Sequence, residues 1–147
     1  EGRGTTQPFE LFGAPYINSA KIAATFCAES IPGIILREVV FEPTSNKWRS
    51  QPCRGFQIHV TDPDKFRPYE TSLRLLQAVI KHHKKEFEWK QPPYEYETEK
   101  LPIDLIIGDA QIRRHLENME PLESITESWQ TDLQEFFEIS QQYHLYR

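Results

Sequence analysis

The chain has 147 residues and a formal net charge of −5, and 38% of its residues are hydrophobic. A chain of this length buries roughly 70% of the surface that its unfolded form exposes, so a core is expected. Nine Phe, six Tyr and three Trp exclude a disordered chain. The negative charge argues against nucleic acid as a partner, and every apolar run is far shorter than the roughly 20 residues of a membrane span.

The chain opens on Glu1 without an initiator Met, a basic leader or an apolar leader, so we expect that upstream sequence has been removed. Two cysteines, Cys27 and Cys53, form either one disulfide or two buried thiols. Their spacing does not decide between these states, and two cysteines in a chain of this length favour free thiols.

The first half of the chain predicts one helix and two strands. Ser19 is the expected N-cap of a helix that Pro32-Gly33 stops. Residues 34–42 and 55–61 are rich in β-branched and apolar residues, which predicts strands. Because residues 43–54 have the composition of a loop rather than a crossover helix, the two strands are expected to pair antiparallel.

The strand at 55–61 alternates between apolar and polar residues, which predicts one buried and one exposed face. The residues expected to point inward are Phe56, Ile58 and Val60, and those expected to point outward are Gln57, His59 and Thr61.

The second half predicts helices. Residues 68–84 form the clearest amphipathic segment, with Leu73, Leu76, Val79 and Ile80 on one face. Residues 86–100 read as an ordered loop rich in Pro and aromatic residues, and 112–119 as a short helix. A long terminal helix is expected after Pro121, with an inward apolar stripe of Leu122, Ile125, Trp129, Leu133, Phe136 and Phe137. No internal repeat or boundary is visible, so residues 1–147 are expected to form a single α+β domain with helices packed on a small, mainly antiparallel sheet.

The segment from Gly2 to Thr6 has the most functional character. Its two glycines allow close approach of a ligand, and Arg3 between them carries a permanently charged, planar group. These residues suit an anionic or sugar ligand. Equally, the glycines form a turn, and Thr5 or Thr6 caps a helix that starts near Pro8. The segment lacks the ending of a phosphate-binding loop and the strand that precedes a dinucleotide fingerprint.

His59 stands near a strand end, where it either contacts substrate or serves as a solvent-facing structural histidine. His82-His83 lies among lysines and is expected to form a solvated basic face. No Cys/His set has the spacing of a structural zinc site, so neither a metal nor another cofactor is expected. The acidic residues show no pairing at the separation that glycoside hydrolysis needs.

Four stretches carry a family resemblance. They are Glu1-Gly2-Arg3-Gly4-Thr5-Thr6-Gln7-Pro8-Phe9-Glu10, Gly13-Ala14-Pro15-Tyr16, Phe41-Glu42-Pro43-Thr44 and Gln57-Ile58-His59-Val60-Thr61-Asp62. The chain resembles the C-terminal domain of the NamZ-type exo-β-N-acetylmuramidases. The likeness continues through Phe66-Arg67-Pro68 and Lys100-Leu101-Pro102-Ile103-Asp104-Leu105 to the terminal helix.

The resemblance implies a larger protein that removes N-acetylmuramic acid from the non-reducing end of peptidoglycan fragments. Its Rossmann-like N-terminal domain, absent here, carries the proposed catalytic glutamate in a Glu-His-Gly stretch that this sequence lacks. No residue of this chain is therefore assigned a catalytic role, and the isolated chain is expected to be inactive. The implied partners are that upstream domain and a peptidoglycan-derived sugar, and the implied location is periplasmic or secreted.

The resemblance also implies a substrate-binding set at the cleft between the two domains: Glu1, Arg3, Thr5, Thr6 and, on the same wall, His59. Tyr16 stands where many relatives have Trp. Arg3 has the geometry to hold the lactyl carboxylate of N-acetylmuramic acid. Two alternatives stay open, a module that only binds glycan or packs against its neighbour, and a parent enzyme with a different glycan substrate.

Overall fold

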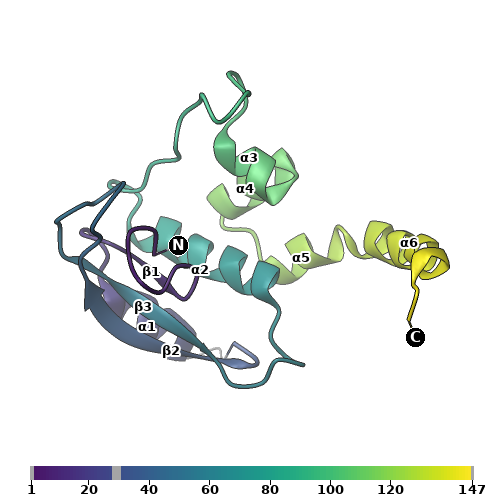
Figure 1. Ribbon diagram of the computed structural model, residues 1–147, viewed down its shortest axis with the longest axis horizontal. Helices are drawn as coiled ribbons and strands as arrows, with labels where there is room; N and C mark the ends of the chain where they lie inside the picture. Colours follow the sequence, from purple (N-terminus) through teal and green to yellow (C-terminus); the bar gives the residue numbers. More distant parts are fainter. Residues whose placement is uncertain (1, 28–30, 147) are drawn as a thin grey trace. The chain divides into compact units, whose positions relative to one another are not determined.

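The computed structural model describes residues 2–27 and 31–146. For Cys27 it describes the backbone but not the side chain. The chain divides into two compact units, residues 1–88 and 89–147, and each is described by itself (Figure 1). Helices accompany a three-stranded antiparallel sheet, which confirms the predicted α+β class.

The sheet of the first unit consists of β1 (Leu11–Ala14), β2 (Ile34–Phe41) and β3 (Cys53–Val60). β3 is the central strand and is antiparallel to both neighbours. The β2–β3 pair was predicted and is confirmed. β1 was missed, because four residues with a glycine among them are too few to show an alternating pattern.

Two helices, α1 (Ser19–Cys27) and α2 (Pro68–His82), lie on one face of this sheet. The buried cluster that joins them to the sheet consists of Ala14, Ile17, Ile22, Phe56, Ala78 and Val79. α2 matches the predicted amphipathic helix. The predicted N-cap of α1 is wrong by one residue: the Asn18 side chain accepts from the Lys21 amide at 3.2 Å, whereas the Ser19 hydroxyl donates to Glu38.

The opposite face of the sheet, here called the outer face, turns away from α1 and α2. By strand alternation it carries Leu11, Gly13, Ile35, Arg37, Val39, Phe41, Cys53, Gly55, Gln57 and His59. Gln57 was expected to face outward into solvent, but it is buried. Its amide accepts from Arg37 and donates to Glu10 at 3.3 Å, so a polar network replaces water around it. Val60, expected inward, is 47% exposed at the end of its strand.

The described residues of the second unit form a loop with one isolated β-bridge, between Tyr94 and Glu97, and then helices. These are α3 (Pro102–Ile107), α4 (Ala110–Glu117), α5 (Leu122–Glu127), α6 (Gln130–Ser140) and the 3₁₀ turn η1 (Gln141–Tyr143). α4 confirms the predicted short helix. α3 was missed; it begins at Pro102 and ends at Gly108, whose φ of 91° permits the left-handed cap. Arg113 ties α3 to α4, with its Nε 2.6 Å from the Asp104 carboxylate.

The predicted terminal helix is wrong in two respects. It is interrupted between α5 and α6, because Trp129 leaves helical geometry with φ −105° and ψ 1°. Its apolar stripe is also divided: Leu122 and Ile125 are buried, whereas the apolar residues of α6 are exposed. Periodicity identifies a face that prefers burial, but no described element of this unit covers the α6 part of that face.

Candidate functional site

The N-terminal segment folds into a tight turn above the sheet. Gly2 and Gly4 have φ values of 61° and 81°, which glycine adopts without strain. The Thr5 hydroxyl donates to the Gly2 carbonyl at 2.6 Å and accepts from the Gln7 amide at 3.2 Å. The turn leads directly into β1, and a helix starting near Pro8 does not form.

A hydrogen-bonded staple joins this turn to the loop between β2 and β3. The backbone amide and the hydroxyl of Thr44 both donate to the Gly4 carbonyl, at 2.8 and 3.0 Å. A Cβ atom on Gly4 would lie 2.6 Å from the Ser45 carbonyl oxygen, so the staple requires glycine. The turn and the loop thus form one structural block.

The backbone of this loop is unusual. Asn46, Trp48 and Ser50 have φ values of 62°, 66° and 56°, a conformation that non-glycine residues seldom adopt. The Ser50 amide donates to the Pro43 carbonyl at 2.9 Å and closes the loop. Such strain is often found where side chains must be presented to a ligand.

Between the turn and the loop lies a pocket of about 170 Å³. Its lining residues are Gly2, Arg3, Gly13, Phe41, Pro43, Asn46, Lys47, Trp48 and Cys53. Phe41, Gly13 and Cys53 belong to the outer face of the sheet, one from each strand. Among the described lining residues two are cationic, Arg3 and Lys47, and none is Asp or Glu; Glu1 lies outside the described residues. The pocket is therefore suited to an anionic group.

Gly13 lies at the sheet side of the pocket, next to Phe41 and Cys53. Gly13 pairs with Gly55 across β1 and β3, and a Cβ on Gly13 would lie 2.6 Å from the Arg54 carbonyl oxygen. No larger residue fits there unless the strands separate. The Phe41 ring occupies the remaining space, with its Cε1 2.9 Å from the same Cβ position, so the glycine lets this aromatic side chain of the pocket pack closely against the strand.

An aromatic stack supports the pocket wall. The Trp48 ring packs edge-on against Tyr16, with centroids 6.1 Å apart, and Tyr16 in turn contacts the His83 ring at 5.5 Å. Burial, with a smaller contribution from Glu86, raises the pKa of Tyr16. The Lys47 ammonium lies 4.9 Å from the centre of the Trp48 ring. Tyr16, the position noted for Trp in relatives, thus contacts Trp48, which lines the pocket.

Of the residues proposed from sequence, the structure places Arg3 in this pocket. Thr5 is engaged in the turn and Thr6 is exposed; neither lines the pocket. His59 is exposed on the outer face. It lies about 20 Å from Cys53, because six residue steps along β3 separate them and each step adds about 3.3 Å. Glu1 lies outside the described residues.

The prediction of a solvated His82-His83 face is wrong. His83 is 5% exposed, and its Nε2 accepts from the Asn18 amide at 3.2 Å. His82 is half-buried, with Nε2 2.8 Å from the Thr25 hydroxyl. Burial is the main cause that lowers the pKa of both histidines. The two histidines thus join the start and the middle of α1 to the end of α2. The lysines around them in the sequence suggested a solvated surface instead.

Lys47, Asn46 and Trp48 are the pocket residues that sequence reasoning missed. Their segment has the composition of an ordinary loop, and only a Trp beside a Lys distinguishes it. Cys53 forms part of the wall with a free, buried thiol, and burial raises its pKa. The side chain of Cys27 lies outside the described part of the chain.

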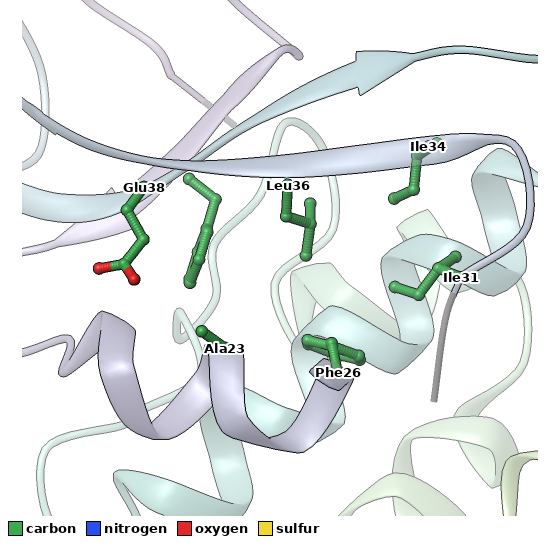
Figure 2. Close-up of a pocket in the computed structure, with 7 residues that line it drawn as sticks. Ala23, Phe26, Ile31, Ile34, Leu36 and Glu38 are labelled. Carbon is green, nitrogen blue, oxygen red and sulfur yellow. The ribbon is translucent and has the colours of Figure 1, made fainter. Parts of the chain in front are cut away.

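A second cavity, of about 220 Å³, lies between α1 and β2 (Figure 2). The side chains drawn there are apolar except for Glu38, which binds Ser19. Among the described lining residues Glu38 is the single polar one, so the cavity is apolar in character and offers no set of polar groups to a ligand. Among the described residues no group of three or more His, Cys, Asp or Glu is placed to hold a metal ion, and no described helix has both the length and the apolar character to cross a membrane.

Comparison with protein families identifies the family of this chain, and two further comparisons give one relative and one similar structure. The family described as "Exo-beta-N-acetylmuramidase NamZ, C-terminal" matches residues 1–146. The chain is 34% identical over 146 residues to the peptidoglycan β-N-acetylmuramidase NamZ of Bacillus subtilis, covering 99% of this chain and 33% of that protein. A crystal structure of a DUF1343 family protein from Bacteroides fragilis superposes with a TM-score of 0.79 at 24% identity, covering 98% of this chain and 37% of that one, which shows a shared fold. The chain thus spans about a third of the length of the relatives it matches.

Proposed function

Because the chain belongs to the C-terminal family of the NamZ exo-β-N-acetylmuramidases, we propose that it forms the substrate-binding wall of such an enzyme. The parent enzyme would remove N-acetylmuramic acid from the non-reducing end of peptidoglycan fragments, as the resemblance implies. The Bacillus relative is about three times as long, so the proposal includes an upstream domain that supplies the chemistry. Its substrate places the parent in the periplasm or outside the cell.

The observation that supports this proposal is the cationic pocket between the N-terminal turn and the 43–52 loop. N-acetylmuramic acid differs from N-acetylglucosamine by a lactyl group that ends in a carboxylate. Arg3 offers this carboxylate two parallel donors, and Lys47 adds a second positive charge at the same pocket. The pocket is smaller than the roughly 300–1,000 Å³ of complete ligand sites, so it fits the lactyl arm while the sugar ring lies outside.

The composition of the pocket also supports binding rather than cleavage. Glycoside hydrolysis needs two carboxyl groups about 5–10 Å apart on either side of the scissile bond. The lining residues that the structure describes include no carboxylate. We therefore propose that this chain recognises the sugar, and that the upstream domain carries out the acid–base chemistry.

The test is steady-state kinetics on the intact protein with matched muraminide and glucosaminide substrates. Arg3→Lys keeps the charge but loses the planar fork, so kcat/KM for the muraminide should fall roughly 10- to 150-fold. This factor corresponds to a loss of about 1.5–3 kcal/mol of transition-state binding. The glucosaminide, which lacks the carboxylate, should change little. Arg49→Lys is the matched control, because Arg49 is exposed in the same loop and does not line the pocket.

Equal losses on both substrates would contradict recognition of the lactyl group by Arg3. That result would favour the alternative in which the domain only packs against its neighbour. Activity that is higher on the glucosaminide in the unmodified protein would instead point to a parent enzyme with a different glycan substrate.

A further inference from the structure

α6, yellow in Figure 1, carries an apolar stripe that its own unit leaves open. None of its eleven residues, all of which are described, is buried. Leu133, Phe136 and Phe137 are 55%, 67% and 52% exposed, and their spacing puts them on one side of the helix. These three residues are called the α6 stripe. A large apolar surface of this kind usually marks an interaction site.

The charges beside the stripe restrict its occupant. From Leu122 to Tyr146 the sequence contains no Lys or Arg, and its acidic residues are Glu123, Glu127, Asp132, Glu135 and Glu138. Two copies joined through this helix would bring like charges together, which disfavours a homodimer. An anionic lipid surface is disfavoured for the same reason. The complementary partner is an apolar surface with a rim of Lys and Arg.

The lengths of the relatives suggest one source for such a surface, namely the rest of the same polypeptide. The matching family is a C-terminal one, and about two thirds of each relative's length lies outside the matched region. A surface on the same polypeptide meets α6 at a high effective concentration, so a modest apolar patch suffices for stable docking. Interfaces between domains of one chain typically bury surfaces of this kind.

We propose that the α6 stripe docks on the upstream part of the same protein, at an apolar surface rimmed by basic residues. This inference rests on the two-domain architecture of the proposed function but not on the identity of the sugar. It gives the C-terminal helix a role separate from the pocket: it anchors this domain to its neighbour.

Zero-length carbodiimide crosslinking of the intact protein tests the charge pattern directly. Carboxylates of Asp132, Glu135 and Glu138 should form links to upstream lysines within one molecule. Links from these residues that run only between copies would overturn the proposal and favour a dimer. Links that run only to lysines of residues 1–88 would also overturn it, because the first unit of this chain would then supply the cover.

Hydrogen exchange of the intact protein supplies a second measurement. In the wild type, amides of residues 130–140 should exchange at least tenfold more slowly than in the Phe136→Ser/Phe137→Ser variant. Thr131→Ser is the matched control, because Thr131 lies on the same helix, about 160° around its axis from Leu133, and the substitution should cost little protection. Equal exchange in the wild type and the double variant would overturn the proposal.

The muramidase assay is run on the same preparations so that the two proposals fail separately. Intramolecular links in a protein without muramidase activity would support docking and contradict only the proposed substrate. Loss of protection in the double variant with an unchanged preference for the muraminide would show that docking and sugar recognition use different residues.

Discussion

Gly4 offers the sharpest test of the block that carries the pocket. Its φ is +81°, and a Cβ at this position would lie 2.6 Å from the carbonyl oxygen and 2.9 Å from the amide nitrogen of Ser45. Both contacts are with backbone atoms, so no side chain can rotate away. Gly4→Ala must therefore push the loop off the N-terminal turn and break the two hydrogen bonds from Thr44 to the Gly4 carbonyl.

The expected cost follows from these contacts. The left-handed conformation costs alanine about 1–2 kcal/mol, and each lost hydrogen bond costs about 0.5–1.5 kcal/mol. Gly4→Ala should thus lower the free energy of unfolding by about 2–5 kcal/mol. Gly108→Ala is the matched control: its φ is +91° and nothing lies within 4 Å of a Cβ there, so it should lose only about 1–2 kcal/mol.

Urea unfolding combined with hydrogen exchange measures both effects, with β3 amides reporting on Gly4 and α4 amides on Gly108. In the intact protein, Gly4→Ala should also reduce kcat/KM for the muraminide more than for the glucosaminide, because Arg3 and Lys47 no longer share one pocket. A Gly4→Ala variant that is no less stable than Gly108→Ala would refute the staple. Unchanged sugar preference in a destabilised variant would refute its link to recognition.

The remaining predictions concern activity, exposure and pH. The isolated 147-residue chain should not hydrolyse a chromogenic N-acetylmuraminide; specific turnover above that of a chain denatured beforehand would contradict the division of work. Phe9 is 83% exposed, so amides of residues 7–12 should be more protected in the intact protein than in this chain, and equal exchange would argue against an interface there. Burial lowers the pKa of His83, and the positive charges of His82 and Lys21 lower it further, whereas Glu86 acts in the opposite direction. Below about pH 6.5 the unfolded chain therefore binds a proton at this histidine more readily than the folded chain does. The free energy of unfolding should therefore be constant from pH 8 to 7 and fall as the pH drops below 6.5. The fall should be at most about 1.4 kcal/mol per pH unit for each such histidine. Equal free energies of unfolding at pH 7.5 and pH 5 in urea titrations would contradict this explanation of His83.

Strong local patterns made part of this fold predictable. The strands at β2 and β3 and the helix α2 each run for eight or more residues with a clear hydrophobic period, which suffices to identify them. β1 and α3 have four and six residues and depend on partners far away in sequence. Their formation is set by the tertiary environment, which local patterns do not contain.

The candidate site was predictable only in part for a related reason. Arg3 is conspicuous because it stands between two glycines, and the structure places it in the pocket. Lys47 comes to the same pocket through the Thr44–Gly4 hydrogen bonds, across 40 positions of sequence. Gln57 and His83 were misjudged because a polar side chain can be buried once specific partners satisfy it, and sequence alone does not name those partners.

The terminal helix shows how a correct pattern can lead to a wrong location. The spacing of Leu122, Ile125, Leu133 and Phe136 indicates a face that prefers burial, and the first two are indeed buried. The prediction that all of these residues pack inward also assumed that another part of this chain covers them. Exposure of Leu133 and Phe136 shows that the described part of their own unit, residues 89–147, does not supply the cover, and it leaves the preference for burial untouched. The hydrophobic pattern then supports the proposed docking surface outside this unit, and the acidic residues beside the α6 stripe are the reason why we propose that this surface is basic at its rim.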